Sequence, residues 1–418
     1  MIKCLEKFAS LNKRIIFMLY IKDYFKFYRK DRKMNQSTAV NEITPAPAHE
    51  FEVVVGSFRA YVTPVVAVVG IFGNIFVILI FYFETKLSRF SVYCISLAFV
   101  QLVALIVNSF MDDFLGRGLS HVLGYYLLAF KWDTHSDMSC KMMEYVPNTM
   151  FFIASFVTVL FSIDRLLTIH QPLKFHSVYY IKYSIMACVG TFLFGFAINI
   201  PLLLSYGLIK QENEFGITLK CTVVATGARK FVADFGLYLV LLGSFTIPTF
   251  IVLILNTLIS IKLWQLHLNR AEMTKSFDTS DSKSSAINPS LMKNQEKELN
   301  RVLGHLAVNV VFLLLTMPLV IVIILRMYSD DNKMYLTNLY LYNSFQHLSR
   351  LFSSLKDVNF SCEFFIYMIF LPNFRNGFQN FFQKCFVNKK NFRSNTMINS
   401  VYNPKLTVKV HESTSGRL

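Results

Sequence analysis

Charged residues are scarce in this sequence. Asp, Glu, Lys and Arg make up 16% of its 418 residues, whereas soluble globular domains contain about 25%. So small a charged fraction, together with 54% hydrophobic residues, excludes intrinsic disorder and argues against a soluble enzyme. The composition indicates an integral membrane protein.

Sequence motifs of catalysis are missing as well. The chain contains no HExxH zinc motif, no glycine-rich phosphate-binding loop and no paired carboxylates outside the motifs described below. We therefore expect a protein that is not an enzyme. We expect no catalytic residue, no metal centre and no organic cofactor in it.

The basic residues have a topological meaning. The net charge is +16, from 42 Lys and Arg against 26 Asp and Glu. A surplus of this kind occurs in nucleic-acid-binding proteins and also in membrane proteins with basic loops. In this chain the basic residues lie between long apolar runs, which places them at an anionic membrane surface. We expect membrane lipids, and not nucleic acid, as their partners.

Several stretches are apolar and long enough, at roughly 20 residues, to cross a membrane as helices. They lack the alternation of barrel strands, and a lipid-exposed backbone then has only the helix to satisfy its hydrogen bonds. The stretches are residues 57–83, 90–111, 138–167, 180–204, 231–264, 298–326 and 337–370. The polar cluster 329–333 separates the last two. The predicted fold is an all-α, seven-helix transmembrane bundle.

Lysine and arginine mark the cytoplasmic side of such a bundle. They concentrate in the loop 262–301 and in the chain after residue 375. We therefore expect a multi-pass plasma-membrane protein with an extracellular N-terminal region over residues 1–56. A membrane domain follows over residues 57–385, and a flexible cytoplasmic tail covers residues 386–418.

The first 33 residues do not fit an extracellular segment. They are rich in Lys and Arg and contain a short apolar run that cannot span a membrane. We interpret residues 1–33 as an over-extended gene model, with Met34 as the start of the protein. Asn35 then begins an Asn-Gln-Ser sequon, a candidate for glycosylation outside the cell.

Three of the cysteines lie where cysteine chemistry is expected. Cys140, at the outer end of the third stretch, and Cys221, in the loop after the fourth, both face an oxidising compartment. We expect a disulfide between them, with two unpaired thiols as the alternative. Cys385 follows an aromatic and basic segment on the cytoplasmic side and is a candidate for palmitoylation.

An Asp164-Arg165 pair lies one membrane crossing beyond Cys140 and is followed by Pro172-Leu173. Further matches occur in order along the chain: Gly73-Asn74, Leu97-Ala98, Pro248, Pro318, Asn359, Tyr367 and Asn373-Phe374. This pattern resembles the rhodopsin-like (class A) G-protein-coupled receptors over residues 57–385. The resemblance implies seven transmembrane helices, a short amphipathic eighth helix, an extracellular ligand and a heterotrimeric G protein as partner.

The resemblance assigns an activation switch to the cytoplasmic end. A charge in a membrane span needs a partner, and Arg165 has Asp164 beside it and Glu298 at the start of helix six. We expect the Arg165–Glu298 bridge to hold the inactive bundle until helix six moves outward, with Tyr367 as a further switch residue. Pro248 and Pro318 are expected to kink helices five and six, because proline removes a backbone donor.

A second set of residues departs from the family pattern. Relatives carry Asp where this chain has Gln101 in helix two, and Asn where it has Glu363 in helix seven. We expect Asn74, Gln101, Asn359 and Glu363 to form a polar cluster that holds a sodium ion or a proton. A neutral Glu363 that is hydrogen-bonded to Gln101 is the alternative.

The ligand is constrained by what the third helix lacks. Pro147 occupies the position at which amine receptors carry an Asp, so an amine ligand is excluded. Lys356 lies within a turn of the retinal-attachment level, but a pair with Asp357 explains this lysine equally well. The candidate ligand-pocket residues are Asp112, Asp113, Glu144, Asn148, His347, Arg350 and Asp357.

The acidic residues of this set favour a cationic peptide, since the guanidinium of arginine pairs with carboxylates through two hydrogen bonds. The chain resembles an invertebrate receptor for FMRFamide-like neuropeptides. A small-molecule chemoreceptor of the same fold is the first alternative. A transporter, with the charges of helix seven along its path, is the second, although the two halves of the chain show no internal repeat.

Overall fold

The computed structural model describes residues 46–83, 87–123, 131–170, 180–213, 216–224, 229–277 and 289–383. The predictions for residues 1–33, Asn35, Cys385 and the tail 386–418 lie outside the described residues and stay predictions.

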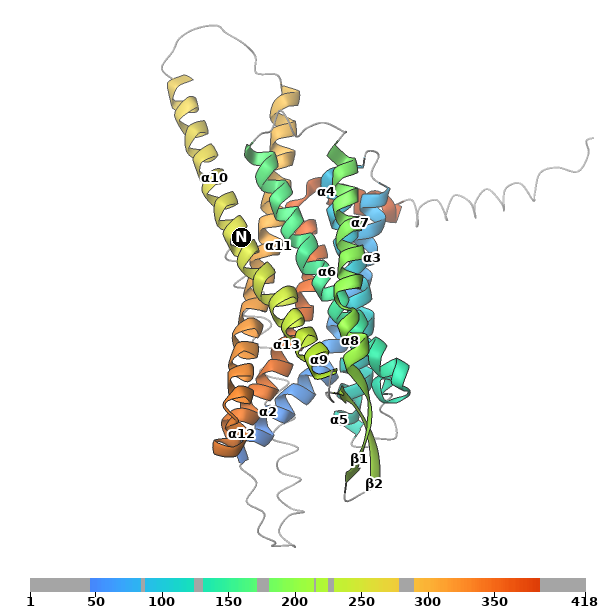
Figure 1. Ribbon diagram of the computed structural model, residues 1–418. Helices are drawn as coiled ribbons and strands as arrows, with labels where there is room; N and C mark the ends of the chain where they lie inside the picture. The colour runs from blue at the N-terminus through green and yellow to red at the C-terminus, as the bar shows by residue number, and fades with distance from the viewer. Residues whose placement is uncertain are drawn as a thin grey trace, which may run out of the picture. The chain divides into compact units, whose positions relative to one another are not determined.

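The described chain is mostly helical, and its helices follow the predicted apolar stretches (Figure 1). The first three transmembrane helices consist of α2 (Ala46–Ser57), η1 (Phe58–Val62) and α3 (Thr63–Tyr82), then α4 (Arg89–Ala104), η2 (Leu105–Gly118) and α5 (Leu119–Leu123), then α6 (Asp137–His170). The next four consist of α7 (Tyr180–Ile198) and α8 (Ile200–Ser205), then α9 (Arg229–Tyr238), η4 (Leu239–Thr246) and α10 (Ile247–Phe277), then α11 (Pro289–Asp331), and finally α12 (Met334–Thr337) and α13 (Leu339–Phe370). The segments η1, η2 and η4 have the wider turn of a π-helix.

Six helices among the described residues are apolar and long enough to cross a membrane: Phe51–Tyr82, Arg89–Val122, Asp137–His170, Ile181–Ser205, Phe231–Leu266 and Glu298–Asp331. The seventh helix, α13, is more polar because it carries Arg350, Lys356, Asp357 and Glu363. It packs against α11 and α3, and all of these charged residues except Arg350 are buried. A polar helix is therefore tolerated because protein, and not lipid, surrounds its charges.

Aromatic side chains fill the centre of the bundle. Phe90, Phe161 and Tyr367, from α4, α6 and α13, are each at most 2% exposed and contact one another through their rings. The span Ile181–Ser205 is different, since only 22% of its apolar window is buried within the chain. Its remaining apolar surface suits contact with lipid.

Glycine allows α3 to lie close to α13. A Cβ atom at Gly70 would collide with the side chain of Ser361. Ser361 in turn donates a hydrogen bond of 2.8 Å to the carbonyl of Val66. Small residues are common at such close helix contacts in membranes.

A β-hairpin lies between the fourth and fifth transmembrane helices. Strand β1 (Tyr206–Asn213) pairs antiparallel with β2 (Gly216–Val223), with Leu208 opposite Cys221. The predicted disulfide is confirmed: Cys221 is bonded to Cys140 of α6 across 81 residues of sequence, with a Cα–Cα distance of 5.5 Å. The hairpin is thereby fixed to one end of the bundle, which we call the disulfide end.

Local polar residues start and end the last helices. Helix α11 continues to Asp331, so only Asn332 and Lys333 of the predicted turn 329–333 lie beyond it, and Lys333 adopts a left-handed conformation with φ of 50°. The side chain of Asn338 then caps α13 by accepting from the backbone N–H of Leu341 at 3.1 Å. After Leu371 the chain turns into a helix over residues 372–383, which corresponds to the predicted eighth helix. Its Phe378 packs edge-on against Phe76 of α3, with 5.4 Å between ring centres.

Candidate functional site

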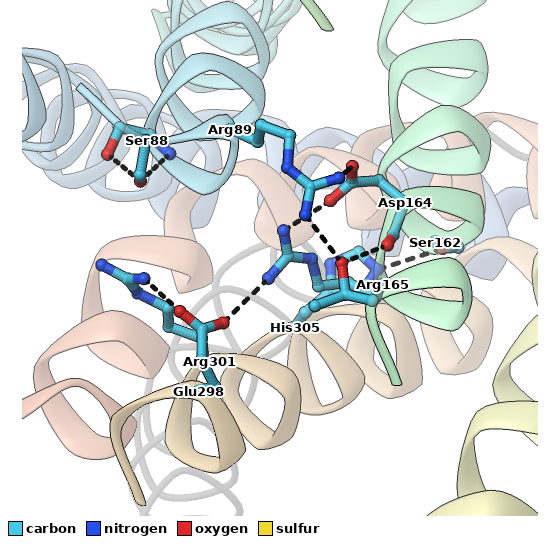
Figure 2. Close-up of polar contacts among 10 residues, drawn as sticks. Ser88, Arg89, Ser162, Asp164, Arg165, Glu298, Arg301 and His305 are labelled. Carbon is cyan, nitrogen blue, oxygen red and sulfur yellow. Dashed lines mark hydrogen bonds and ion pairs between the residues drawn. The ribbon is translucent and has the colours of Figure 1, made fainter. Parts of the chain in front are cut away.

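Arg165 lies near the end of α6 opposite the disulfide, which we call the Arg165 end. Its side chain is only 2% exposed. One guanidinium nitrogen is 2.5 Å from Asp164, and another is 3.7 Å from Glu298 of α11 (Figure 2). Both predicted partners are therefore present in the structure, and the second joins two helices.

Glu298 is shared between two arginines. Arg301, one turn along α11, donates to it at 2.5 Å, which is closer than the 3.7 Å to Arg165. The carboxylate side chain is also 38% exposed. An ion pair with an exposed and divided partner is weak, typically about 0–1 kcal/mol.

Asp164 has a second partner that sequence analysis did not predict. Arg89, in the first turn of α4, donates to Asp164 at 2.8 Å and to Thr168 at 3.2 Å. Figure 2 shows Arg89 reaching across to α6 on the side away from Glu298. A basic residue at the very start of a membrane span was the available signal, but a basic loop residue gives the same pattern.

The ring of Phe90 supports both arginines of this region. The guanidinium carbons of Arg165 and Arg301 lie 5.4 and 5.7 Å from its centre. Contacts of this kind stabilise a cation over the face of an aromatic ring. Phe90 therefore helps to hold the charged groups of α6 and α11 together.

A second polar cluster joins α4 to α13. The amide of Gln101 donates to Glu363 at 2.5 Å, and Tyr367 donates to the other carboxylate oxygen at 3.4 Å. Cys94 contacts the Tyr367 hydroxyl at 3.5 Å. Gln101 and Glu363 of the predicted cluster thus meet, and Tyr367, predicted as a switch residue, shares Glu363 as its acceptor.

The other two predicted members of this cluster are placed differently. Asn74 donates to the backbone carbonyls of Gly70 and Phe360, at 2.8 and 3.0 Å, and so links α3 to α13. Asn359 is buried, and its Oδ1 has no hydrogen-bond partner among the described residues. Neither residue has a hydrogen bond to Glu363 within the described chain.

A small cavity lies next to this cluster. It is lined in part by Gln101, Thr316, Lys356 and Asn359 and has room for about one water molecule. Buried oxygens of Gln101, Thr316 and Asn359 find no partner in the described part of the chain, so a water that donates to them would satisfy two of the three.

These residues do not fit a sodium ion. Both carboxylate oxygens of Glu363 already accept hydrogen bonds, and the ammonium group of Lys356 lines the adjoining cavity. That ammonium lies 3.0 Å from the centre of the Phe151 ring and 4.0 Å from Asp357. A fixed cation in the same space repels a second one.

At the disulfide end, three of the four predicted pocket carboxylates already have partners. Asp113 forms a buried ion pair with Arg59 at 3.0 Å and accepts from Ser354 at 2.7 Å, which joins three helices. Asp112 pairs with Arg117 at 3.0 Å. Asp357 accepts from Asn108 and from Ser109, at 2.7 and 2.6 Å.

Glu144 differs from these three carboxylates. It lies on α6 one turn from Cys140 and is half-buried, and its side chain has no hydrogen bond or ion pair to any described residue. Asn148, one turn further, donates to the backbone carbonyl of Glu144 at 2.7 Å. On α13, His347 is half-buried and Arg350 is exposed. Glu144 is therefore the predicted pocket carboxylate without a partner among the described residues.

The two proline positions differ. Pro248 follows η4, so the turns of helix five are already widened directly before it. Pro318 lies inside α11, which continues through it as one helix of 43 residues. Thr316, close by, has its hydroxyl buried without a partner in the described chain.

A further polar cluster, not foreseen as a unit from the sequence, lies between α6, α10 and α11. It consists of Ser162, Asn256, His305 and Asn309, all at most 6% exposed. Asn309 lies 2.8 Å from Asn256, 2.9 Å from Ser162 and 3.0 Å from His305. In the sequence each of these is an ordinary polar residue of a helix, so the cluster is recognised only from the contacts in the tertiary structure.

Comparison with known proteins agrees with this arrangement. The model of the 7 transmembrane receptor (rhodopsin family) matches residues 73–355. The C-C chemokine receptor type 7 of Mus musculus is 28% identical over 178 residues, which are 41% of this chain and 43% of that receptor. The match thus spans less than half the length of this curated relative.

The chain belongs to the rhodopsin family of seven-transmembrane receptors, because the family match covers most of its length. It is a multi-pass membrane protein whose family consists of receptors and not of enzymes. The predicted fold class, a seven-helix bundle with a short eighth helix, is confirmed.

Proposed function

We propose that this protein is a plasma-membrane receptor that binds an extracellular ligand at the disulfide end and activates a heterotrimeric G protein at the Arg165 end. The contact of Arg165 with Glu298 carries the proposal, because it joins α6 to α11 through a carboxylate that is accessible to solvent. Outward movement of α11 separates the two residues and frees Arg165 for the G protein. The disulfide end is then extracellular and the C-terminus cytoplasmic.

The proposed ligand is a peptide with a cationic group. Glu144 supports this class, since it is the pocket carboxylate without a partner in the described chain, and an arginine of the peptide would pair with it. The disulfide-anchored hairpin adds open strand edges, to which an extended peptide can hydrogen-bond. The relative named above is, by its name, a receptor for C-C chemokines.

The coupling is tested by nucleotide exchange on a co-expressed G protein, in cells exposed to a library of amidated cationic peptides. We expect an active peptide for the wild type and loss of its response in Arg165→Ala. Glu144→Gln should weaken the peptide at least tenfold, whereas Asp331→Asn, at an exposed acidic residue outside the predicted pocket, should not. Activation by lipids or odorants, with no response to any peptide, would favour the small-molecule chemoreceptor.

Glu363 is proposed to act as a protonated or hydrogen-bonded carboxyl and not as an ion ligand. Its two donors, Gln101 and Tyr367, support this choice. A carboxyl buried between helices can gain or lose a proton when its donors move, which couples α4 and α13 during activation.

A further inference from the structure

The buried cluster of Ser162, Asn256, His305 and Asn309 has no part in the switch described so far. We propose that these four residues, which we call the clamp, hold α11 against α6 and α10 in the resting receptor and so set its activity without ligand. The inference rests on the proposed function for its meaning, because α11 is the helix whose movement frees Arg165.

Asn309 is the centre of the clamp. Its amide nitrogen has two hydrogens and donates to Ser162 of α6 at 2.9 Å and to Asn256 of α10 at 2.8 Å, and His305 of α11 itself lies 3.0 Å from it. His305 adds a second contact between α11 and α6, at 3.1 Å from the hydroxyl of Ser162. Two residues of α11, Asn309 and His305, thus make the clamp's polar contacts with α6 and α10.

Burial makes these contacts matter. Ser162 and Asn309 are both 0% exposed, and His305 is 1% exposed. Polar groups in such a place gain no replacement hydrogen bonds from lipid or bulk water if the helices separate by a small distance. The Glu298 carboxylate, by contrast, exchanges its partners for water easily because it is 38% exposed.

The clamp also lies close to Arg165. The ring of His305 contacts the ring of Phe161 at 4.0 Å between centres, and Phe161 lies under the Arg165 guanidinium at 5.5 Å. Figure 2 shows Ser162 and His305 directly beside Arg165. Movement of α11 that breaks the clamp therefore also disturbs the packing that holds Arg165.

The clamp is incompletely satisfied in the resting arrangement. Asn309 Oδ1, Asn256 Nδ2 and His305 Nδ1 are buried and have no hydrogen-bond partner in the part of the chain that the structure describes. These atoms are available for new partners when α11 moves. The cluster is thus suited to two positions of α11, because some of its polar atoms lack a hydrogen bond in one position and can form one in the other.

The test replaces Asn309 with leucine, which has a similar volume and no amide. Loss of these hydrogen bonds should shift the ratio of resting to active receptor by about five- to thirtyfold. We expect Asn309→Leu to raise nucleotide exchange without ligand by that range, normalised to receptor at the cell surface. Asn256→Leu removes one of the bonds and should have a smaller effect of the same sign.

The control is Thr257→Val, directly beside Asn256 on α10. The Thr257 hydroxyl is exposed and bonds only to Leu253 of its own helix within the described structure. This variant should leave the activity without ligand unchanged. If Asn309→Leu does not reach the surface, Asn256→Leu and Ser162→Ala answer the same question.

A second measurement separates the clamp from the proposed function. Spin labels at His170→Cys on α6 and Asn300→Cys on α11 report the distance between these helices in purified receptor without G protein. Asn309→Leu should add a longer distance that wild type and Thr257→Val lack. A longer distance with no nucleotide exchange in any variant supports the clamp but contradicts the proposed coupling. An unchanged distance with unchanged basal exchange, or a fall in both, overturns the clamp.

Discussion

Two ion pairs, one at each end of the bundle, differ in burial and in distance. At the disulfide end, Arg59 and Asp113 are 3.0 Å apart, with side chains 9% and 5% exposed, and Ser354 adds a third helix to the pair. At the Arg165 end, Arg165 is 3.7 Å from Glu298, which is 38% exposed and bonded more closely to Arg301.

This difference indicates which charges are fixed and which can be released. A buried pair with an additional hydrogen bond loses much when either member leaves, because the other stays buried and unpaired. A long pair with an exposed partner loses little, since water replaces the contact. The Arg59–Asp113 pair is therefore suited to rigidity, and the Arg165–Glu298 pair to change.

The contrast also explains why the acidic residues of the disulfide end are a poor guide to the ligand. Asp112, Asp113 and Asp357 serve the packing of the helices through Arg117, Arg59 and the pair Asn108 and Ser109. Their charges are largely compensated. Glu144 has no partner among the described residues, which narrows the peptide hypothesis to one carboxylate.

The largest effect is expected from breaking the fixed pair. Arg59→Ala leaves Asp113 buried without its cation and should lower the stability of the receptor by about 3–5 kcal/mol. Thermal unfolding of the purified protein in detergent measures this loss. The control is Lys141→Ala, in an exposed pair with Asp137, which should change stability by about 0.5 kcal/mol or less.

The double variant Arg59→Met with Asp113→Leu should recover much of the lost stability, because no buried charge is then left unpaired. Equal stability of Arg59→Ala and Lys141→Ala would contradict the distinction between fixed and releasable pairs.

The disulfide should have the next largest effect. Cys221→Ser releases the hairpin from α6 and should lower stability by about 2–4 kcal/mol. The double variant with Cys140→Ser should match the single one, and reducing agent should then have no further effect. A wild type that is insensitive to reduction, together with a fully stable Cys221→Ser, would show that the hairpin needs no anchor.

The releasable pair is tested by opposite changes on α11. Glu298→Gln should raise nucleotide exchange without ligand by about two- to fivefold, as expected for an ion pair of about 0–1 kcal/mol. Arg301→Ala should lower it, since Glu298 then has Arg165 as its nearer partner. Variants that change basal exchange in the same direction would exclude competition for Glu298.

The smallest effect concerns the cluster between α4 and α13. Replacing sodium chloride by choline chloride should change agonist affinity less than about twofold in the wild type, because an ammonium group lines the adjoining cavity. Glu363→Gln should behave in the same way. A sodium dependence that disappears in Glu363→Gln would restore the ion site and contradict the proton proposal.

Part of the site could be predicted from the sequence because its members are close along the chain or at fixed helical spacing. The Asp164-Arg165 pair is adjacent, and the distance from Cys140 to Arg165 is one membrane crossing. The Gln101–Glu363 contact could be predicted for a different reason. The carboxylate that relatives carry in helix two is replaced by Gln101, and helix seven carries the carboxylate of Glu363 instead. The disulfide followed from two cysteines in the same compartment.

The remaining contacts depend on how each helix is rotated about its axis and on how deep it lies. Arg89 and Arg59 are ordinary basic residues at helix ends in the sequence, yet both pair with aspartates of other helices. Asn256 and Asn309 lie 53 residues apart and meet at 2.8 Å. Hydropathy averages over all sides of a helix, so it cannot say which polar residues face one another.

The sequence by itself determined the membrane class, the seven spans and the position of the arginine at one end and the cysteines at the other. These properties follow from local composition and from distances along a helix. Only the tertiary structure decided which charged residues pair between helices, that Glu144 has no partner among the described residues, and that Asn309 joins three helices. Such pairings are properties of neighbouring helices in space, where the low dielectric of the interior makes each partner matter.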